Sequence, residues 1–357
     1  MIQFDTKAYL RNMSQRTERV YDRRNVAAFG GFEQWQRSFR QRLSELLGLD
    51  KLGWMSAIDW PAPRLLERTE EPDHIREKWH IAVEPEVTLP LYLLLPKAGK
   101  PPYPLVIAPH GHECGKEAYA GLFENEEERQ RAVAIDQTIG LQAVGQGYAV
   151  IAPNVRGFRE MARIEELSDA YSYPISNPYT RRNSCEELQR RSLFYGRTLT
   201  GDRVHDMRRV IDFASTRSEI DMRNIIMTGN STGGTVSLFT AAVDERVGIV
   251  VPSCSFCNFT DTALQIYHCS CGTIPGMLQW GEYEDIAGLI APRPLLIING
   301  AKDDLFPSED ASRAFAGVRE IYREAGAPDR CEHFIGPEGH RFYKEAAWRF
   351  IRRHLPV

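Results

Sequence analysis

A serine flanked by glycines lies in Gly229-Asn230-Ser231-Thr232-Gly233-Gly234, directly after an apolar run and before a helix-like run. The run 224–228 is typical of a strand and the run 236–242 of a helix. A strand, a glycine-flanked serine and a helix form a nucleophile elbow, which lifts the serine hydroxyl clear of a sheet. The glycines remove the β-carbons that would block the close approach of strand and helix. The pattern therefore predicts Ser231 as a nucleophile, and the alternative is a serine that only caps the helix.

A serine hydroxyl needs a base and an orienting acid, and both follow Ser231 in the chain. The apolar run 295–300 reads as a buried strand, and Asp303 stands on the loop after it, ahead of Pro307. We expect Asp303 to be the acid, with its neighbour Asp304 as the alternative. His340 follows the short strand-like run 331–335 on a Gly/Pro-rich loop, which favours it as the base. His333 is the competitor, but it lies inside that alternating run, where a histidine is more often a strand side chain.

Acyl transfer also needs N–H groups aimed at the oxyanion, one of them from the residue after the nucleophile. That residue is Thr232. The loop His110-Gly111-His112 follows the strand-like run 104–109, so the His112 amide is the expected second donor. The two histidines could also be read as a metal pair, but no carboxylate pattern such as H-E-x-x-H accompanies them.

These pieces, together with Arg156-Gly157-Phe158, resemble the dienelactone hydrolase and acetyl xylan esterase branch of the α/β-hydrolases. The resemblance runs from about residue 79 to the C-terminus, and the tracts 269–276 and 285–294 look like the same region of acetyl xylan esterase-like bacterial proteins. It implies a serine ester hydrolase. Dienelactone hydrolases proper carry a cysteine nucleophile, where this chain has Ser231.

One named esterase group does not fit the motifs. The carbohydrate esterases that deacetylate both xylo-oligosaccharides and cephalosporin C carry R-G-Q, G-x-S-Q-G-G and His-Glu. This chain has Arg156-Gly157-Phe158, Ser231-Thr232-Gly233-Gly234 and His340-Arg341 at those places. The substrate of that group therefore cannot be transferred.

The composition agrees with a soluble enzyme that has a substantial core. The chain has 357 residues, 43% hydrophobic and 26% charged, with a formal net charge of -4. The length allows one large α/β domain with additions. The mildly acidic balance gives no electrostatic reason to expect nucleic acid or anionic membrane as a partner. The polar start lacks the apolar core of a secretory signal, so we expect a cytoplasmic protein unless a signal was removed.

Seven cysteines are an odd and sparse set for a disulfide framework. Cys254 with Cys257, and His268-Cys269-Ser270-Cys271, use zinc-ligand residue types, but their spacing is poor for a zinc site. Free cysteines in apolar surroundings usually pack as small hydrophobes. We therefore expect structural cysteines, no metal and no cofactor.

The expected fold is the α/β-hydrolase fold, with a mainly parallel sheet covered by helices on both faces. Residues 76–357 form the predicted catalytic domain. Residues 1–75 lack its βα rhythm and read as a helical N-terminal extension. It has amphipathic helices at 16–21 and 32–47 and a proline-bearing connector at 54–71. We expect the extension to pack on the catalytic body or on a second subunit, which makes a homo-oligomer possible, and an independent binding module is the alternative.

Two irregular insertions, about 158–200 and 258–284, follow strands and are candidate walls of the substrate site. They contribute Phe158, Tyr267 and Trp280 as candidate substrate-binding residues, and His110 on the earlier loop is a fourth. Their polar and aromatic content suits sugars or small aromatic esters better than long acyl chains.

The predicted activity is that of a serine carboxylesterase that hydrolyses short acyl esters, acetyl esters of carbohydrates first, through a Ser231-His340-Asp303 triad and an acyl-enzyme. A small-molecule ester is thus the expected partner. Two alternatives remain: a peptidase or amidase of the same fold, and a non-catalytic binding protein of this fold.

Overall fold

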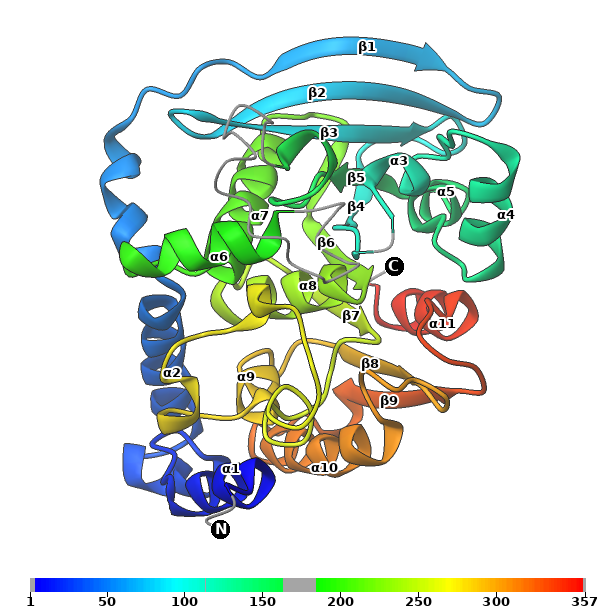
Figure 1. Cartoon of the computed structure of the whole chain (residues 1–357). Coiled ribbons are helices and arrows are strands. Elements are labelled where there is room, and N and C mark those ends of the chain that lie inside the picture. The colour runs from blue at the N-terminus through cyan, green and yellow to red at the C-terminus, as the bar shows by residue number, and fades with distance from the viewer. Residues whose placement is uncertain (1–3, 113, 163–183, 356–357) are drawn as a thin grey trace.

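The structure is a computed structural model that describes residues 4–112, 114–162 and 184–355. Its strands form one nine-stranded sheet in the order β1-β2-β3-β5-β4-β6-β7-β8-β9 (Figure 1). The strands are β1 (Arg64–Glu70), β2 (His74–Glu84), β3 (Val87–Pro96), β4 (Tyr103–Ile107), β5 (Ala149–Pro153), β6 (Ile220–Asn230), β7 (Ile249–Ser253), β8 (Leu295–Gly300) and β9 (Cys331–Gly336). Strands β1, β2, β3 and β5 pair antiparallel, and the sheet is parallel from β5 through β4 to β9. Parallel strands joined by helical crossovers are the predicted architecture.

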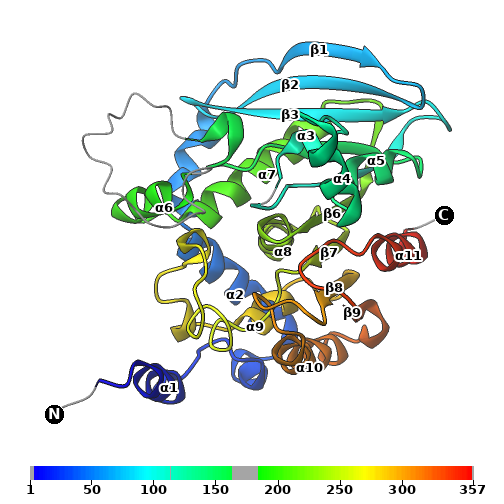
Figure 2. The ribbon, with the colours of Figure 1, turned by 45° about the vertical axis from the view of Figure 1, so that its right-hand side comes forward.

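Helices cover both faces of this sheet, with α11 on one side and α2 and α9 on the other in Figure 2. They are α1 (Thr6–Arg16), α2 (Phe32–Leu47), α3 (Lys116–Tyr119), α4 (Glu126–Ala134), α5 (Ile139–Val144), α6 (Cys185–Phe194), α7 (Leu199–Ser215), α8 (Thr232–Val243), α9 (Tyr283–Gly288), α10 (Ser308–Glu324) and α11 (Lys344–His354). None of the helices in the described residues is long and apolar enough to cross a membrane.

Because the direction of the side chains alternates along the central strands, their apolar residues contribute to two cores, one on each face of the sheet. Leu105 and Ile107 of β4 face the core that contains α2, α7, α8 and α10, whereas Val106 between them faces the core that contains α5 and α11. Successive side chains of a strand point to opposite faces, so one apolar strand serves both layers. This explains why the central strands are continuous apolar runs that are easy to recognise.

The N-terminal segment differs in part from its prediction. Helix α2 covers the predicted range 32–47, but 16–21 is not helical beyond Arg16, where α1 ends. The expected connector at 54–71 contains strand β1, which pairs with β2. The side chains of β1 are exposed along almost its whole length, so it lacks the apolar alternation that reveals a strand.

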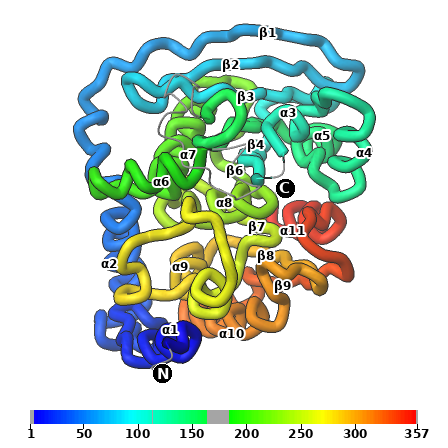
Figure 3. The backbone as a smooth tube through the Cα atoms, viewed as in Figure 1, coloured from blue at the N-terminus to red at the C-terminus, as the bar shows by residue number. Residues whose placement is uncertain are grey.

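Helix α2 packs on the body of the protein. Trp35, Phe39, Leu43 and Leu47 recur at helical spacing, are fully buried and share the core of α7 and α8. Figure 3 shows the chain running from α1 along one side of the molecule to β1 at the opposite end. Of the two expected places for the extension, the body of the protein and a second subunit, helix α2 occupies the first.

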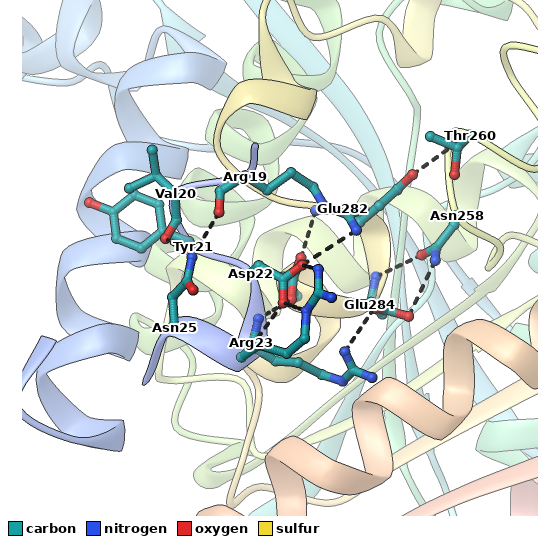
Figure 4. A network of polar contacts seen from close by, with 12 residues as sticks. Arg19, Val20, Tyr21, Asp22, Arg23, Asn25, Asn258, Thr260, Glu282 and Glu284 are labelled. Carbon is teal, nitrogen blue, oxygen red and sulfur yellow. Dashed lines mark hydrogen bonds and ion pairs between the residues drawn. The ribbon is translucent and has the colours of Figure 1, made fainter. Parts of the chain in front are cut away.

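A polar network also ties the N-terminal segment to the second insertion (Figure 4). The Arg23 amide donates to Asp285 Oδ1 at 2.9 Å, and the Arg23 side chain pairs with Glu284 at 3.7 Å. Glu282 accepts from the amides of Phe259 and Thr260 at 2.8 and 2.9 Å. The network fixes both ends of the loop between β7 and α9.

Candidate active site

Ser231 stands in a strained turn between β6 and α8. Its φ is 57° and its ψ is -127°, a conformation that a residue with a β-carbon rarely adopts. A β-carbon on Gly233 would lie 2.0 Å from the Pro109 carbonyl oxygen, and one on Gly229 would lie 2.5 Å from the same atom. The glycines therefore allow the close approach that the sequence pattern predicts. The half-exposed Ser231 is not held as a helix cap, since its side chain makes no capping hydrogen bond.

A carboxylate and an imidazole meet at the ends of β8 and β9. Asp303 Oδ2 lies 2.9 Å from His340 Nδ1. The other oxygen, Oδ1, accepts from the amides of Leu305 and Phe306 at 3.0 and 3.3 Å, which fixes the carboxylate. The Phe306 ring stacks on the His340 ring at 6.0 Å between centroids. An imidazole held in this way by a buried carboxylate has its Nε2 free to exchange a proton.

The competing residues lie elsewhere. Asp304 is exposed to solvent, whereas Asp303 is buried. His333 lies within β9, with its Nε2 at 3.1 Å from Asn299 Oδ1 and its ring against Phe315. Burial lowers the pKa of His333 to about 4, so this side chain is neutral at pH 7. His333 is thus a strand side chain.

The elbow and the His340 loop are attached to the same strand end. The Ser231 amide donates to the Ser253 carbonyl at 2.8 Å, and the Ser253 hydroxyl donates to the Arg341 carbonyl at 3.1 Å. Within the part of the chain that the structure describes, Ser231 Oγ and His340 make no hydrogen bond. Such bonds are often long in a free enzyme and tighten with substrate.

Cys254 lies beside the Asp303–His340 pair, although its spacing in the sequence gave no sign of this. Its Sγ is within 4.8 Å of ligand atoms of both residues and 3.2 Å from the Arg341 carbonyl oxygen. Burial, with the nearby charge of Asp303, raises the pKa of Cys254 to about 12. The group is therefore a neutral thiol and a poor nucleophile at pH 7.

The loop 110–112 lies against the elbow. A β-carbon on Gly111 would lie 2.8 Å from the Asn230 carbonyl oxygen and 3.2 Å from Ser231 Cβ. His112 Nδ1 lies 2.5 Å from Thr232 Oγ1, so the two residues predicted to donate to an oxyanion are in contact through their side chains. The Thr232 amide opens α8, and the first N–H groups of a helix have no partner within it.

The side chains of His110, the first residue of this loop, and of Phe158 are buried next to each other. His110 is fully buried, and its Nε2 accepts from the Val155 amide at 3.1 Å while its Nδ1 lies 2.9 Å from the Gly111 carbonyl oxygen. Burial lowers the pKa of His110 to about 4, consistent with this neutral tautomer. The buried Phe158 ring meets both loop imidazoles edge to face. These two candidate substrate residues thus brace the loop through buried side chains.

The insertions hold the other two candidates. Residues 163–183 of the first insertion lie outside the described residues. Tyr267 is exposed and donates to Glu186 at 2.6 Å. Trp280 packs against Arg42 at 4.1 Å and near Tyr21, so its ring takes part in the contact with the N-terminal segment. Neither makes a described contact with Ser231 or His340.

Three cysteines and a histidine meet next to the site. His112 Nε2 lies 3.8 Å from Cys185 Sγ and 3.9 Å from Cys271 Sγ, and Cys269 completes the group. Sequence spacing does not reveal this cluster, because Cys185 lies at the start of α6, more than 80 residues before Cys269 and Cys271 in the chain.

A mainly parallel sheet with a serine elbow after β6 and an acid–imidazole pair after β8 and β9 defines an α/β-hydrolase. The chain belongs to the Abhydrolase family, which it matches over residues 3–356. The putative hydrolase YtaP of Bacillus subtilis (strain 168) is 26% identical over 327 residues, which span 88% of this chain and 98% of that protein.

Solved structures of esterases have the same fold. The structure of a putative acetyl xylan esterase from Bacteroides fragilis NCTC 9343 matches with a TM-score of 0.78 and 19% identity, covering 99% of this chain and 96% of that one. A glucuronoyl esterase from Solibacter usitatus matches with a TM-score of 0.59 and 14% identity, covering 90% of this chain and 93% of that one.

Proposed function

We propose that this protein is a serine carboxylesterase that removes short acyl groups, acetyl groups first, from carbohydrates. The observation that carries the proposal is the 2.9 Å contact between Asp303 and His340, combined with a strained serine after β6. Ser231 is the nucleophile, His340 the base and Asp303 the orienting acid.

In the acylation half, His340 Nε2 takes the proton of Ser231 as Oγ attacks the ester carbonyl. The negative charge that forms on the oxygen of the ester carbonyl is bound by the amides of Thr232 and His112. Asp303 keeps the imidazole in the required tautomer and stabilises its cation. His340 then gives the proton to the departing alcohol, which leaves an acyl-enzyme on Ser231.

In the deacylation half, water enters where the alcohol left. His340 removes a proton from this water, which attacks the acyl carbon. The same two amides bind the second oxyanion. Collapse returns the proton to Ser231 and releases the acid. The cycle needs no group beyond the chain and water.

The carbohydrate part of the proposal rests on relatives and on the loops around the site. Two of the solved structures of this fold are named as esterases that act on carbohydrate esters, one a putative acetyl xylan esterase and the other a glucuronoyl esterase. The loop between β7 and α9 presents polar and aromatic side chains, among them Tyr267 and His268. Such side chains suit a sugar alcohol better than a lipid.

The test is a series of p-nitrophenyl esters with acetyl, butyryl and octanoyl groups, followed by peracetylated xylose and xylo-oligosaccharides. We expect kcat/KM to fall steeply with acyl length and acetate to be released from the sugars. Equal or rising turnover toward octanoate would contradict the short-acyl assignment. Turnover of anilides without turnover of esters would favour the amidase alternative, and no turnover of either class would favour a binding protein.

A further inference from the structure

The four side chains that meet beside the elbow have the composition of a metal site. One ligand atom each of His112, Cys185, Cys269 and Cys271 lies within 4.8 Å of the other three. With zinc–sulfur bonds of about 2.3 Å and zinc–nitrogen bonds of about 2.0–2.1 Å, a nitrogen and a sulfur of one tetrahedral site lie about 3.6 Å apart. His112 Nε2 lies 3.8 Å from Cys185 Sγ and 3.9 Å from Cys271 Sγ, within about 0.3 Å of that edge length.

The hydrogen-bond partner of the second ring nitrogen of His112 is of the kind that metal-bound histidines have. A metal-bound histidine usually donates its second ring N–H to an oxygen. His112 turns Nε2 toward the sulfurs and Nδ1 toward the Thr232 hydroxyl, at 2.5 Å. Hydrogen bonds also hold the loop that carries Cys269 and Cys271 against α6 and α7. Thr200 of α7 donates to the Cys271 carbonyl at 2.7 Å, and Gln189 of α6 donates to the Thr273 carbonyl at 2.7 Å.

A buried cation lies beside the sulfurs. Arg203 is buried, and its guanidinium donates to Cys185 Sγ at 3.0 Å and to the Arg156 carbonyl at 2.9 and 3.0 Å. No carboxylate among the described residues pairs with it. A buried charge needs a counter-charge. Three thiolates around a divalent ion carry one net negative charge, which the Arg203 guanidinium balances.

We propose that His112, Cys185, Cys269 and Cys271 bind one zinc ion in a closed, four-coordinate structural site. Soft thiolates with one imidazole select zinc over magnesium or calcium. Binding releases the three thiol protons to solvent and changes no oxidation state. The four protein ligands leave no position for substrate, so the ion is not part of the ester chemistry.

The zinc joins three segments at the nucleophile. His112 belongs to the loop that abuts Ser231, Cys185 opens α6, and Cys269 and Cys271 lie in the loop between β7 and α9. Bound through Nε2, His112 must keep its proton on Nδ1 and donate it to Thr232. The ion therefore holds the loop whose His112 amide is the proposed oxyanion donor. This last consequence rests on the proposed function, whereas the metal content does not.

The first measurement is the metal content of the full chain, purified without a polyhistidine tag or chelator, by inductively coupled plasma mass spectrometry. We expect one zinc per chain in the wild type. Cys331→Ala, which removes a buried cysteine outside the cluster, should retain it. Cys269→Ser, at the least buried of the three sulfurs, should lose it while the circular dichroism spectrum stays native.

A second measurement keeps the proposal testable if Cys269→Ser does not fold. Reduced wild-type protein freed of metal is titrated with Co²⁺. The expected result is one equivalent bound, with thiolate charge-transfer bands in the near ultraviolet and the visible bands of tetrahedral cobalt. The proposal is overturned if the wild type neither contains zinc nor takes up Zn²⁺ or Co²⁺. It is also overturned if Cys269→Ser folds and keeps its zinc, or if peptide mapping finds a disulfide within the cluster.

The proposed function and the zinc site can fail separately. A zinc-containing protein that hydrolyses no ester would overturn the first and keep the second. A metal-free esterase with intact turnover would do the reverse.

Discussion

The Nδ1 atom of His112 lies 2.5 Å from the Thr232 hydroxyl oxygen, and this contact joins two parts of the molecule that are distant in sequence. One is the loop after β4, and the other is the first residue of α8. Both residues were predicted to donate amides to an oxyanion. Their contact fixes the loop against the elbow, which is the arrangement that a preorganised oxyanion site needs.

The first prediction separates the two candidate bases. His340→Ala should lower kcat/KM for p-nitrophenyl acetate by about ten-thousandfold or more, because the serine loses its base. His333→Gln should stay within about threefold of the wild type, since His333 packs in β9 and contacts Asn299 rather than the site. Comparable losses in both variants would argue against His340 as the base.

The second prediction concerns the acid. Asp303→Asn should lower kcat by about ten-thousandfold, since an amide cannot hold the imidazole in the required tautomer or stabilise its cation. Asp304→Asn is the matched control, because Asp304 is its exposed neighbour. Steady-state kinetics of the two variants at pH 7.5 provide the comparison. A larger loss in Asp304→Asn would reverse the assignment.

The third prediction tests the close approach of strand and helix at the elbow. Gly233→Ala puts a methyl group 2.0 Å from the Pro109 carbonyl oxygen, so the backbone must move. We expect a loss of about 1–3 kcal/mol in the free energy of unfolding, and a loss of turnover. Gly53→Ala meets no atom within 4 Å and should change little. Urea unfolding of both variants gives the answer, and equal stability would show that the elbow tolerates a side chain.

Part of the fold and of the candidate site could be predicted from the sequence, and part could not. The central strands were predictable because each buries both faces and reads as an apolar run, as in β4 and β7. Asp303 and His340 follow β8 and β9, the last two strands of the parallel part of the sheet, so their contact at the carboxyl ends of these strands was predictable from the order of elements. Strand β1 was missed because it is polar and exposed. The cysteine cluster was missed because its members are brought together only by tertiary packing.

The fourth prediction is a dependence of stability on pH. Burial lowers the pKa of His333 to about 4, whereas an unfolded histidine titrates near its usual value of about 6.5. The unfolded chain thus binds more protons between those values, so stability is lost as the pH falls from 6.5 to 4. In His333→Gln, whose amide can still donate to Asn299, the loss should be smaller by up to about 3 kcal/mol. Urea unfolding at pH 7, 5.5 and 4.5 measures it, and parallel curves for the two proteins would refute this cause.

The most direct test of the whole account is the hydrolysis of p-nitrophenyl acetate by the wild type and by Ser231→Ala, side by side, with circular dichroism to show that both are folded. The account predicts clear turnover by the wild type and a loss of about a millionfold in kcat, down to the background rate, in the variant. A folded Ser231→Ala protein that keeps its turnover within about tenfold would contradict Ser231 as the nucleophile, and with it the proposed mechanism.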